Sequence, residues 1–233
     1  MSLNVNTISP AGSALTIGDS GDTIVVADDI KVNTVKDAGG NTLWVSNGSG
    51  VLSSVSSGFG GALNLISTQT ASDSASLSFT SGIDSTYKEY VFKFININPA
   101  TNDTAFKFQA GSSYNTAITS TTFRPWHRED DGSSGLAYVA GEDQAQGTAY
   151  QSIGFSESSD ADNDGGGELH LFNPSSTTYV KNFYSRFQYV SSTPSSVDFY
   201  LAGYLNTTSA ITQVQFKMAS GNFDGKIKMY GVS

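Results

Sequence analysis

Two clusters of polar residues in this chain have the types and spacing needed to bind a ligand. The first is Thr122-Phe-Arg-Pro-Trp-His-Arg-Glu129, which brings Arg124, Trp126, His127 and Arg128 into one short stretch. A planar aromatic ring can stack on a sugar ring, and an arginine offers a fork of N–H donors to hydroxyl or carboxylate groups. The cluster predicts a turn-rich loop that contacts a glycan. In the alternative interpretation, Trp126 fills the edge of the fold and both arginines pair with neighbouring acids.

The second cluster is the acidic run Asp160-Ala-Asp-Asn-Asp-Gly-Gly-Gly-Glu168. Alternate carboxylates followed by Gly165 reproduce the first half of a calcium loop. Leu171 stands where such a loop has its bidentate glutamate, so the ligand set is incomplete. We expect no cofactor other than calcium, and two interpretations stay open: a hydrophilic hairpin between Phe155 and Leu169, or a weak site. The ligands of that weak calcium site would be Asp160, Asp162, Asp164 and Glu168.

Catalysis is not expected from the remaining polar residues. The tetrapeptide Gly18-Asp-Ser-Gly21 copies the sequence around the nucleophile of chymotrypsin-like serine proteases. In that family the catalytic histidine precedes the serine, whereas His127 and His170 both lie downstream of it here. The acidic groups Glu129-Asp130-Asp131 and Glu142-Asp143 adjoin Gly-rich turns rather than apolar strands that would raise a carboxyl pKa. Both groups are therefore interpreted as solvated loops.

The elements that position these clusters are predicted to be β-strands. The stretch 214–233 alternates apolar and polar residues in two runs joined by a Gly-rich corner, with Val214, Phe216 and Met218 on one face. Further alternating runs lie at 75–79, 89–97, 105–108, 150–155, 168–172, 182–189 and 197–201. With 24 Gly, 14 Phe and 11 Tyr, this pattern predicts an all-β chain ending in a jelly-roll-like β-sandwich. The residues expected to point inward are Leu169, Leu171, Phe199, Leu201, Val91 and Ile227.

The first sixty residues follow a different pattern, because they contain only short β-like bursts separated by Gly, Asp and Asn. Such a segment buries little surface by itself, so we expect another copy of the chain or a docking partner to hold it. The stretch 53–61 is rich in Ser and Gly and is typical of a hinge. The predicted domains are therefore 1–60, for attachment and trimerisation, and 61–233. The apolar residues assigned to attachment are Ile24, Val26, Ile30, Val32 and Trp44.

Charge and composition narrow the possible partners. The net charge is −9 and no Lys/Arg cluster occurs, so nucleic acid is not an expected partner. The chain has no Cys, which excludes disulfides and thiolate sites. Neither a signal peptide nor an apolar run of membrane-spanning length is present, so membrane insertion is not expected.

Three blocks of the C-terminal part resemble a β-sandwich domain found at the ends of bacteriophage fibre proteins. They are Tyr90-Val-Phe-Lys-Phe94, Leu169-His-Leu-Phe-Asn-Pro174, and the terminal segment with its Ser-Gly-Asn corner, Gly-Lys-Ile-Lys strand and Tyr-Gly. The resemblance runs from about Ser67 to the end. Residues 28–50 resemble, in their Gly-punctuated β turns, the attachment and shaft pieces of such proteins.

This resemblance implies a virion structural protein assembled in the host cytoplasm. The expected form is a homotrimeric tail fibre whose N-terminal segment binds other virion proteins and whose sandwich binds a host surface glycan or protein. A head fibre or capsid decoration protein is the alternative within this class. A free carbohydrate-binding module or glycan hydrolase is the alternative outside it, and the N-terminal segment disfavours both because a free lectin has no use for it.

Overall fold

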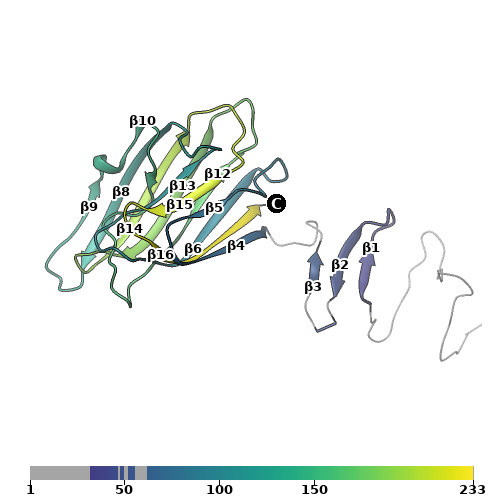
Figure 1. Ribbon diagram of the computed structural model, residues 1–233, viewed down its shortest axis with the longest axis horizontal. Helices are drawn as coiled ribbons and strands as arrows, with labels where there is room; N and C mark the ends of the chain where they lie inside the picture. Colours follow the sequence, from purple (N-terminus) through teal and green to yellow (C-terminus); the bar gives the residue numbers. More distant parts are fainter. Residues whose placement is uncertain (1–31, 47, 50–51, 56–61, 233) are drawn as a thin grey trace, which may run out of the picture. The chain divides into compact units, whose positions relative to one another are not determined.

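The computed structural model describes residues 32–46, 48–49, 52–55 and 62–232. The chain divides into two units, residues 1–59 and 60–233, and each is described by itself (Figure 1). The predicted domain boundary after residue 60 lies one residue from this division. Three of the residues assigned to attachment, Ile24, Val26 and Ile30, lie outside the described residues.

The described part of the N-terminal unit is a small antiparallel sheet in the order β1-β2-β3. Its strands are β1 (Thr34–Lys36), β2 (Thr42–Ser46) and β3 (Leu52–Val55). The Asp37 side chain closes the first turn by accepting hydrogen bonds from the backbone N–H of Asn41 at 2.8 Å and from its side-chain amide at 2.9 Å. Trp44 on the central strand is half-buried, and Val32 is 38% exposed.

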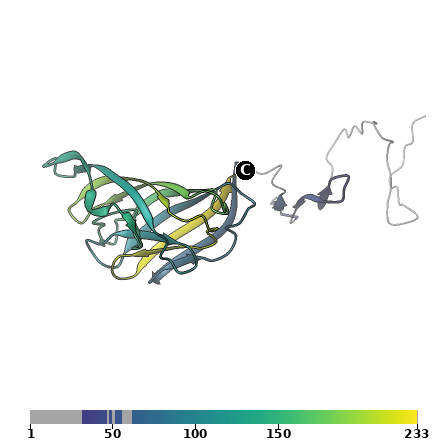
Figure 2. The ribbon, with the colours of Figure 1, turned by 90° about the horizontal axis from the view of Figure 1, so that it is seen from above.

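Within residues 62–232 the chain forms two antiparallel sheets, which Figure 2 shows in a second view. The nine-stranded sheet runs, in spatial order, through β10 (Ala145–Gly147), β8 (Ile118–Arg128), β14 (Ser195–Leu205), β13 (Lys181–Val190), β12 (Gly165–Phe172), β6 (Glu89–Pro99), β16 (Phe223–Val232) and β4 (Leu63–Ser74), with β9 (Ser134–Tyr138) also paired to β8. The four-stranded sheet contains β11 (Gln151–Ser152), β7 (Phe106–Ala110), β15 (Val214–Met218) and β5 (Leu77–Phe79). A single 3₁₀ turn, η1 (Ala140–Glu142), accompanies the strands of this described part. None of the helical structure described is long and apolar enough to cross a membrane.

A phenylalanine-rich core joins the two sheets. Phe92 and Phe94 of the large sheet each lie 5.3 Å, centroid to centroid, from Phe216 of the small sheet. Each fully buried phenylalanine contributes about 1.5–3 kcal/mol through removal of apolar surface from water. The all-β sandwich predicted from the alternating runs is therefore confirmed, while the jelly-roll strand order stays a prediction.

The inward-facing residues are predicted correctly with one exception. The five that belong to the buried core are Leu169, Leu171, Phe199, Leu201 and Ile227. Val91 is also buried, but its neighbours Tyr90 and Phe92 belong to the core, so strand alternation places Val91 on the opposite face. There it pairs in register with His170 of β12. The prediction that Val91 points inward is therefore wrong.

The C-terminal corner carries the chain from one sheet to the other. As predicted, two alternating strands flank it: β15 pairs with β5 and β7, whereas β16 pairs with β4 and β6. Gly221 in the corner has φ +72°, and a Cβ there would lie 2.2 Å from Thr101 Oγ1. Glycine is required at this point because a side chain would be strained and would collide with Thr101.

Candidate functional site

The predicted ligand-binding stretch is a strand and not a loop. Residues 124–128 form the C-terminal end of β8, which pairs with β14 on one side and with β9 on the other. The sequence does not predict this strand, because Pro125 lacks the N–H that a sheet ladder uses. The recorded pairs with β14 lie on either side of it, at Trp126 with Val197 and at Phe123 with Tyr200.

Alternation along β8 brings three of the four predicted residues into one cavity of about 250 Å³. Arg124, Trp126 and Arg128 line it, and we call it the Arg124–Arg128 cavity. His127 is not among the lining residues: its side chain is 59% exposed and its Nε2 lies 2.9 Å from Asp131 Oδ1. The remaining lining residues come from other segments of the chain and carry mostly hydroxyl groups: Ser133, Ser156, Ser191, Thr193, Ser195 and Val197.

Trp126 is both a wall of this cavity and a part of the fold. It packs against the hydrophobic core. Gly135 of β9 pairs with it, and a Cβ at Gly135 would lie 2.7 Å from the indole ring. The ring therefore lies directly over the backbone of β9, which holds its orientation.

The Arg124 guanidinium lies against two aromatic rings, and one of its N–H donors is unpaired within the described part of the chain. Its guanidinium carbon lies 5.8 Å from the ring centroid of Trp126 and 5.0 Å from that of Phe155, distances at which a cation is attracted to a ring. Within the described part of the chain, its buried Nε has no hydrogen-bond partner. A buried donor without a partner costs about 1–3 kcal/mol.

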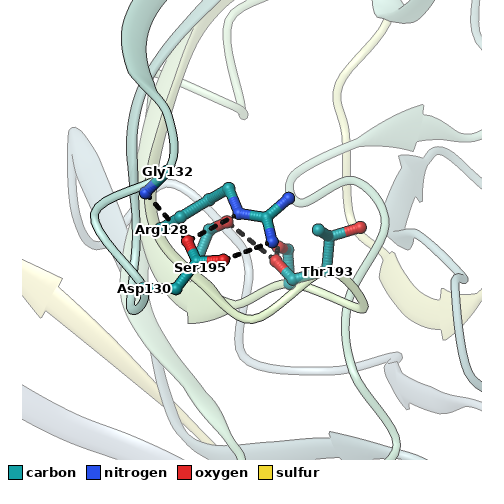
Figure 3. Close-up of polar contacts among 6 residues, drawn as sticks. Arg128, Asp130, Gly132, Thr193 and Ser195 are labelled. Carbon is teal, nitrogen blue, oxygen red and sulfur yellow. Dashed lines mark hydrogen bonds and ion pairs between the residues drawn. The ribbon is translucent and has the colours of Figure 1, made fainter.

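Arg128 is held in place by an ion pair at the rim (Figure 3). Its Nε and Nη2 donate to the two carboxylate oxygens of Asp130 at 3.0 and 2.8 Å, and the backbone N–H of Gly132 donates to Asp130 Oδ1 at 2.9 Å. The hydrogen bond from Arg128, followed by that from Gly132, lowers the pKa of Asp130. A guanidinium group has five N–H donors, so Arg128 keeps donors for a ligand beside Ser195 and Thr193.

The hydroxyl groups of the cavity complement these donors. Ser191 Oγ and Ser195 Oγ both donate to the backbone oxygen of Thr193, at 2.6 and 2.7 Å. Their own lone pairs are left as acceptors. The cavity thus offers charged donors and neutral acceptors, which is the chemistry that a ligand with both an acidic group and hydroxyl groups requires.

The acidic run is arranged differently from a calcium loop. Asp160, Asp162 and Asp164 lie in the connection before β12. Glu168 lies inside β12, where it forms an ion pair with Lys93 at 3.3 Å and lies 3.2 Å from His170 Nε2. Among the described residues, no three His, Cys, Asp or Glu side chains gather in a group that could hold a metal.

The connection that contains these aspartates is not a hairpin. It leads from β11 in the four-stranded sheet to β12 in the nine-stranded sheet, so the hairpin interpretation is wrong. The amide of Asn98 holds it by donating to the backbone oxygen of Asp160 at 3.0 Å and to that of Asn163 at 2.5 Å. The Asn98 side chain thus fixes the backbone of this connection at two points.

The carboxylates interpreted as solvated loops have partners. Asp143 accepts a hydrogen bond from Thr122 Oγ1 at 2.9 Å, and Glu142 accepts one from Ser152. Thr122 is fully buried, so Asp143 contacts the interior of the fold. The interpretation of Asp143 as part of a solvated loop is therefore incomplete.

Sequence reasoning missed Glu157, which is 1% exposed. One carboxyl oxygen accepts the backbone N–H of Phe106 at 2.8 Å, but burial dominates and raises the pKa of Glu157 to about 8. Its position in the polar run 156–160 gives no sign of burial.

Comparisons with protein-family models, with curated proteins and with solved structures found no match to this chain.

Proposed function

We propose that this chain is a bacteriophage virion protein, a homotrimeric fibre whose C-terminal sandwich binds an acidic glycan of the host cell surface in the Arg124–Arg128 cavity. The observation that carries the binding role is the lining of this cavity, which combines Arg124 and Arg128 with Trp126 and a set of hydroxyl-bearing side chains. The virion role is supported by the three sequence blocks that resemble phage fibre domains.

The charges of the cavity favour an acidic ligand. The Arg128 guanidinium is balanced by Asp130, while Arg124 lies against aromatic rings. The remaining positive charge matches a carboxylate or sulfate group, and the fork of an arginine suits such groups better than a lysine would. One weak site per chain would be sufficient for attachment to the host cell, because three copies on a fibre raise the apparent affinity through effective concentration.

The N-terminal unit supports an assembly role. Its described strands have three to five residues each, and small sheets of this kind need further packing to be stable. Half-buried Trp44 and partly exposed Val32 and Val55 offer apolar surface to another copy of the chain or to another virion protein.

Native mass spectrometry of the full chain tests the assembly. The expected species has three times the 24.5 kDa mass of one chain. Deleting residues 1–58 should weaken the trimer, because the deletion removes the proposed contacts. A folded, stable monomer of the full chain at micromolar concentration would contradict the fibre role.

Adsorption of the purified protein to host cells tests the binding role. The double variant Arg124→Gln, Arg128→Gln should lose adsorption while its melting temperature stays close to that of the wild type. Lys226→Gln is the matched control, because it removes a positive charge from an exposed position of β16. Unchanged adsorption of the double variant would place the contact elsewhere.

A further inference from the structure

The outer face of the nine-stranded sheet, opposite the core, carries a set of stacked aromatic side chains. Phe123 of β8 and Tyr200 of β14 are cross-strand neighbours whose rings stack at 4.7 Å with an interplanar angle of 2°. His170 of β12 and Tyr184 of β13 stack in the same way at 4.4 Å and 13°. Phe123 and Tyr184 are each 43% exposed, although aromatic rings of this size are more often buried.

A small residue interrupts this aromatic surface. Ala202 of β14 pairs with Tyr184 on one side and with Thr121 of β8 on the other. Neighbouring strands lie about 4.8 Å apart, so the side chains of Tyr184 and Thr121 are separated by roughly 9.6 Å with only a methyl group between them. One ring face of Tyr184 is covered by His170, and the other face is turned to this gap.

The gap is a cavity of about 300 Å³, which we call the Ala202 slot. Its width suits a single ring that enters edge-on and lies flat against Tyr184. Among the residues that line it are Thr121, Phe123, Glu168, Tyr184, Arg186, Tyr200 and Ala202.

A second hollow of about 270 Å³ adjoins the slot and is polar. The two hollows share Glu168 and Arg186, and the second is also lined by Gly166, Gly167, Gln188 and Asp198. Arg186 donates from Nε and Nη2 to Asp198 Oδ2 at 2.9 and 2.7 Å. The charges here are balanced, because Arg186 pairs with Asp198 and Glu168 pairs with Lys93.

We propose that the Ala202 slot and the polar hollow beside it form a second binding site, for a neutral oligosaccharide. One sugar ring stacks on the open face of Tyr184, and the next sugar places its hydroxyl groups on Arg186, Asp198 and Gln188. A neutral ligand fits because the charged groups already satisfy one another, whereas fixed ion pairs still offer donors and acceptors to hydroxyl groups. This site goes beyond the acidic-glycan site and does not depend on the virion role.

Isothermal titration of the full chain with maltohexaose, cellohexaose and chitohexaose tests the proposal. Wild-type protein should bind at least one of these at millimolar concentration. Ala202→Phe fills the slot and Tyr184→Ala removes the stacking face, so each should weaken binding about tenfold or more, which corresponds to about 1.4 kcal/mol. Tyr179→Ala is the matched control, because Tyr179 is a 69% exposed tyrosine outside both hollows and should leave binding unchanged.

Three results would overturn the proposal. The first is that wild-type protein binds none of the three oligosaccharides. The second is that binding survives Ala202→Phe, or is lost in Arg124→Gln, which would show that the sugar uses the Arg124–Arg128 cavity instead. The third is that Ala202→Phe changes the oligomeric state in sedimentation velocity, which would make this face a contact between copies of the chain.

Discussion

The Arg124–Arg128 cavity and the Ala202 slot lie on opposite faces of the same strand, and they differ in chemistry. Arg124 and Trp126 of β8 face the cavity, whereas Thr121 and Phe123 face the slot. The strand period of two therefore separates a charged site from an aromatic one over a few residues.

The two sites also differ in their relation to the fold. The cavity is built partly from core residues, because Trp126 packs against the core and over Gly135. The slot is built from half-exposed residues on the outer face, with Tyr184 and Phe123 each 43% exposed. Truncation of Trp126 should therefore lower stability and binding together, whereas substitutions at the slot should change mainly binding.

The largest effect is expected next to the cavity, at Glu157. Burial raises its pKa to about 8 from the ordinary value of 4.5, so the folded protein keeps a proton that the unfolded chain releases. Stability from this proton is complete below about pH 4.5 and is lost as the pH rises to about 8. The free energy of unfolding should fall by up to about 1.4 kcal/mol per pH unit within this window.

Chemical denaturation of the wild type and of Glu157→Gln between these pH values measures the effect. The variant should lose the slope and should be more stable than the wild type at pH 8. Glu168→Gln serves as the control, because Glu168 is partly exposed and ion-paired and its substitution should leave the slope intact. A slope that persists in Glu157→Gln would assign the proton to another group.

A smaller effect separates Trp126 from Tyr184. Trp126→Ala should lower the free energy of unfolding by about 3 kcal/mol, because it removes a large ring from the edge of the core. Tyr184→Ala should lower it by less than about 1 kcal/mol, because its ring is half-exposed on the surface. Urea denaturation of both variants provides the comparison, and equal losses would contradict the distinction between the two sites.

The smallest effect is expected at the acidic connection. Asn98 already holds the backbone at Asp160 and Asn163, so calcium should add little. The melting temperature should be the same in chelator and in millimolar calcium. A calcium-dependent rise that disappears in Asp162→Asn would instead indicate a metal site at this connection.

Much of the sandwich is predictable because its strands alternate regularly. Val214, Phe216 and Met218 were assigned to one face from period alone, and all three are buried. Val91 was misplaced because both of its neighbours are also apolar, so hydrophobicity could not distinguish the two faces. The strand β8 was missed because Pro125 and three basic residues interrupt the apolar pattern.

The sites are less predictable than the fold. Arg124, Trp126 and Arg128 could be grouped from sequence because they lie in one short stretch. The sequence did not predict the strand that places them on one face and His127 on the other. The slot could not be predicted, because the gap at Ala202 is visible only when β13, β14 and β8 are placed in register. Glu157 gave no signal, because a carboxylate in a Ser-rich run is indistinguishable from a solvated one until its neighbours are known.

The central claim is that the Arg124–Arg128 cavity selects for negative charge, and one affinity comparison tests it most directly. The dissociation constants of the full chain should be measured for oligosaccharides of galacturonate, glucuronate and mannuronate and for the methyl ester of each, which keeps the backbone but removes the charge. At least one acid should bind tenfold or more tightly than its ester, as expected for a charge-assisted hydrogen bond worth about 1.5–3 kcal/mol. This preference should disappear in Arg124→Gln and persist in Lys226→Gln. Equal affinity for acid and ester in all three pairs, or a preference that survives Arg124→Gln, would contradict the claim.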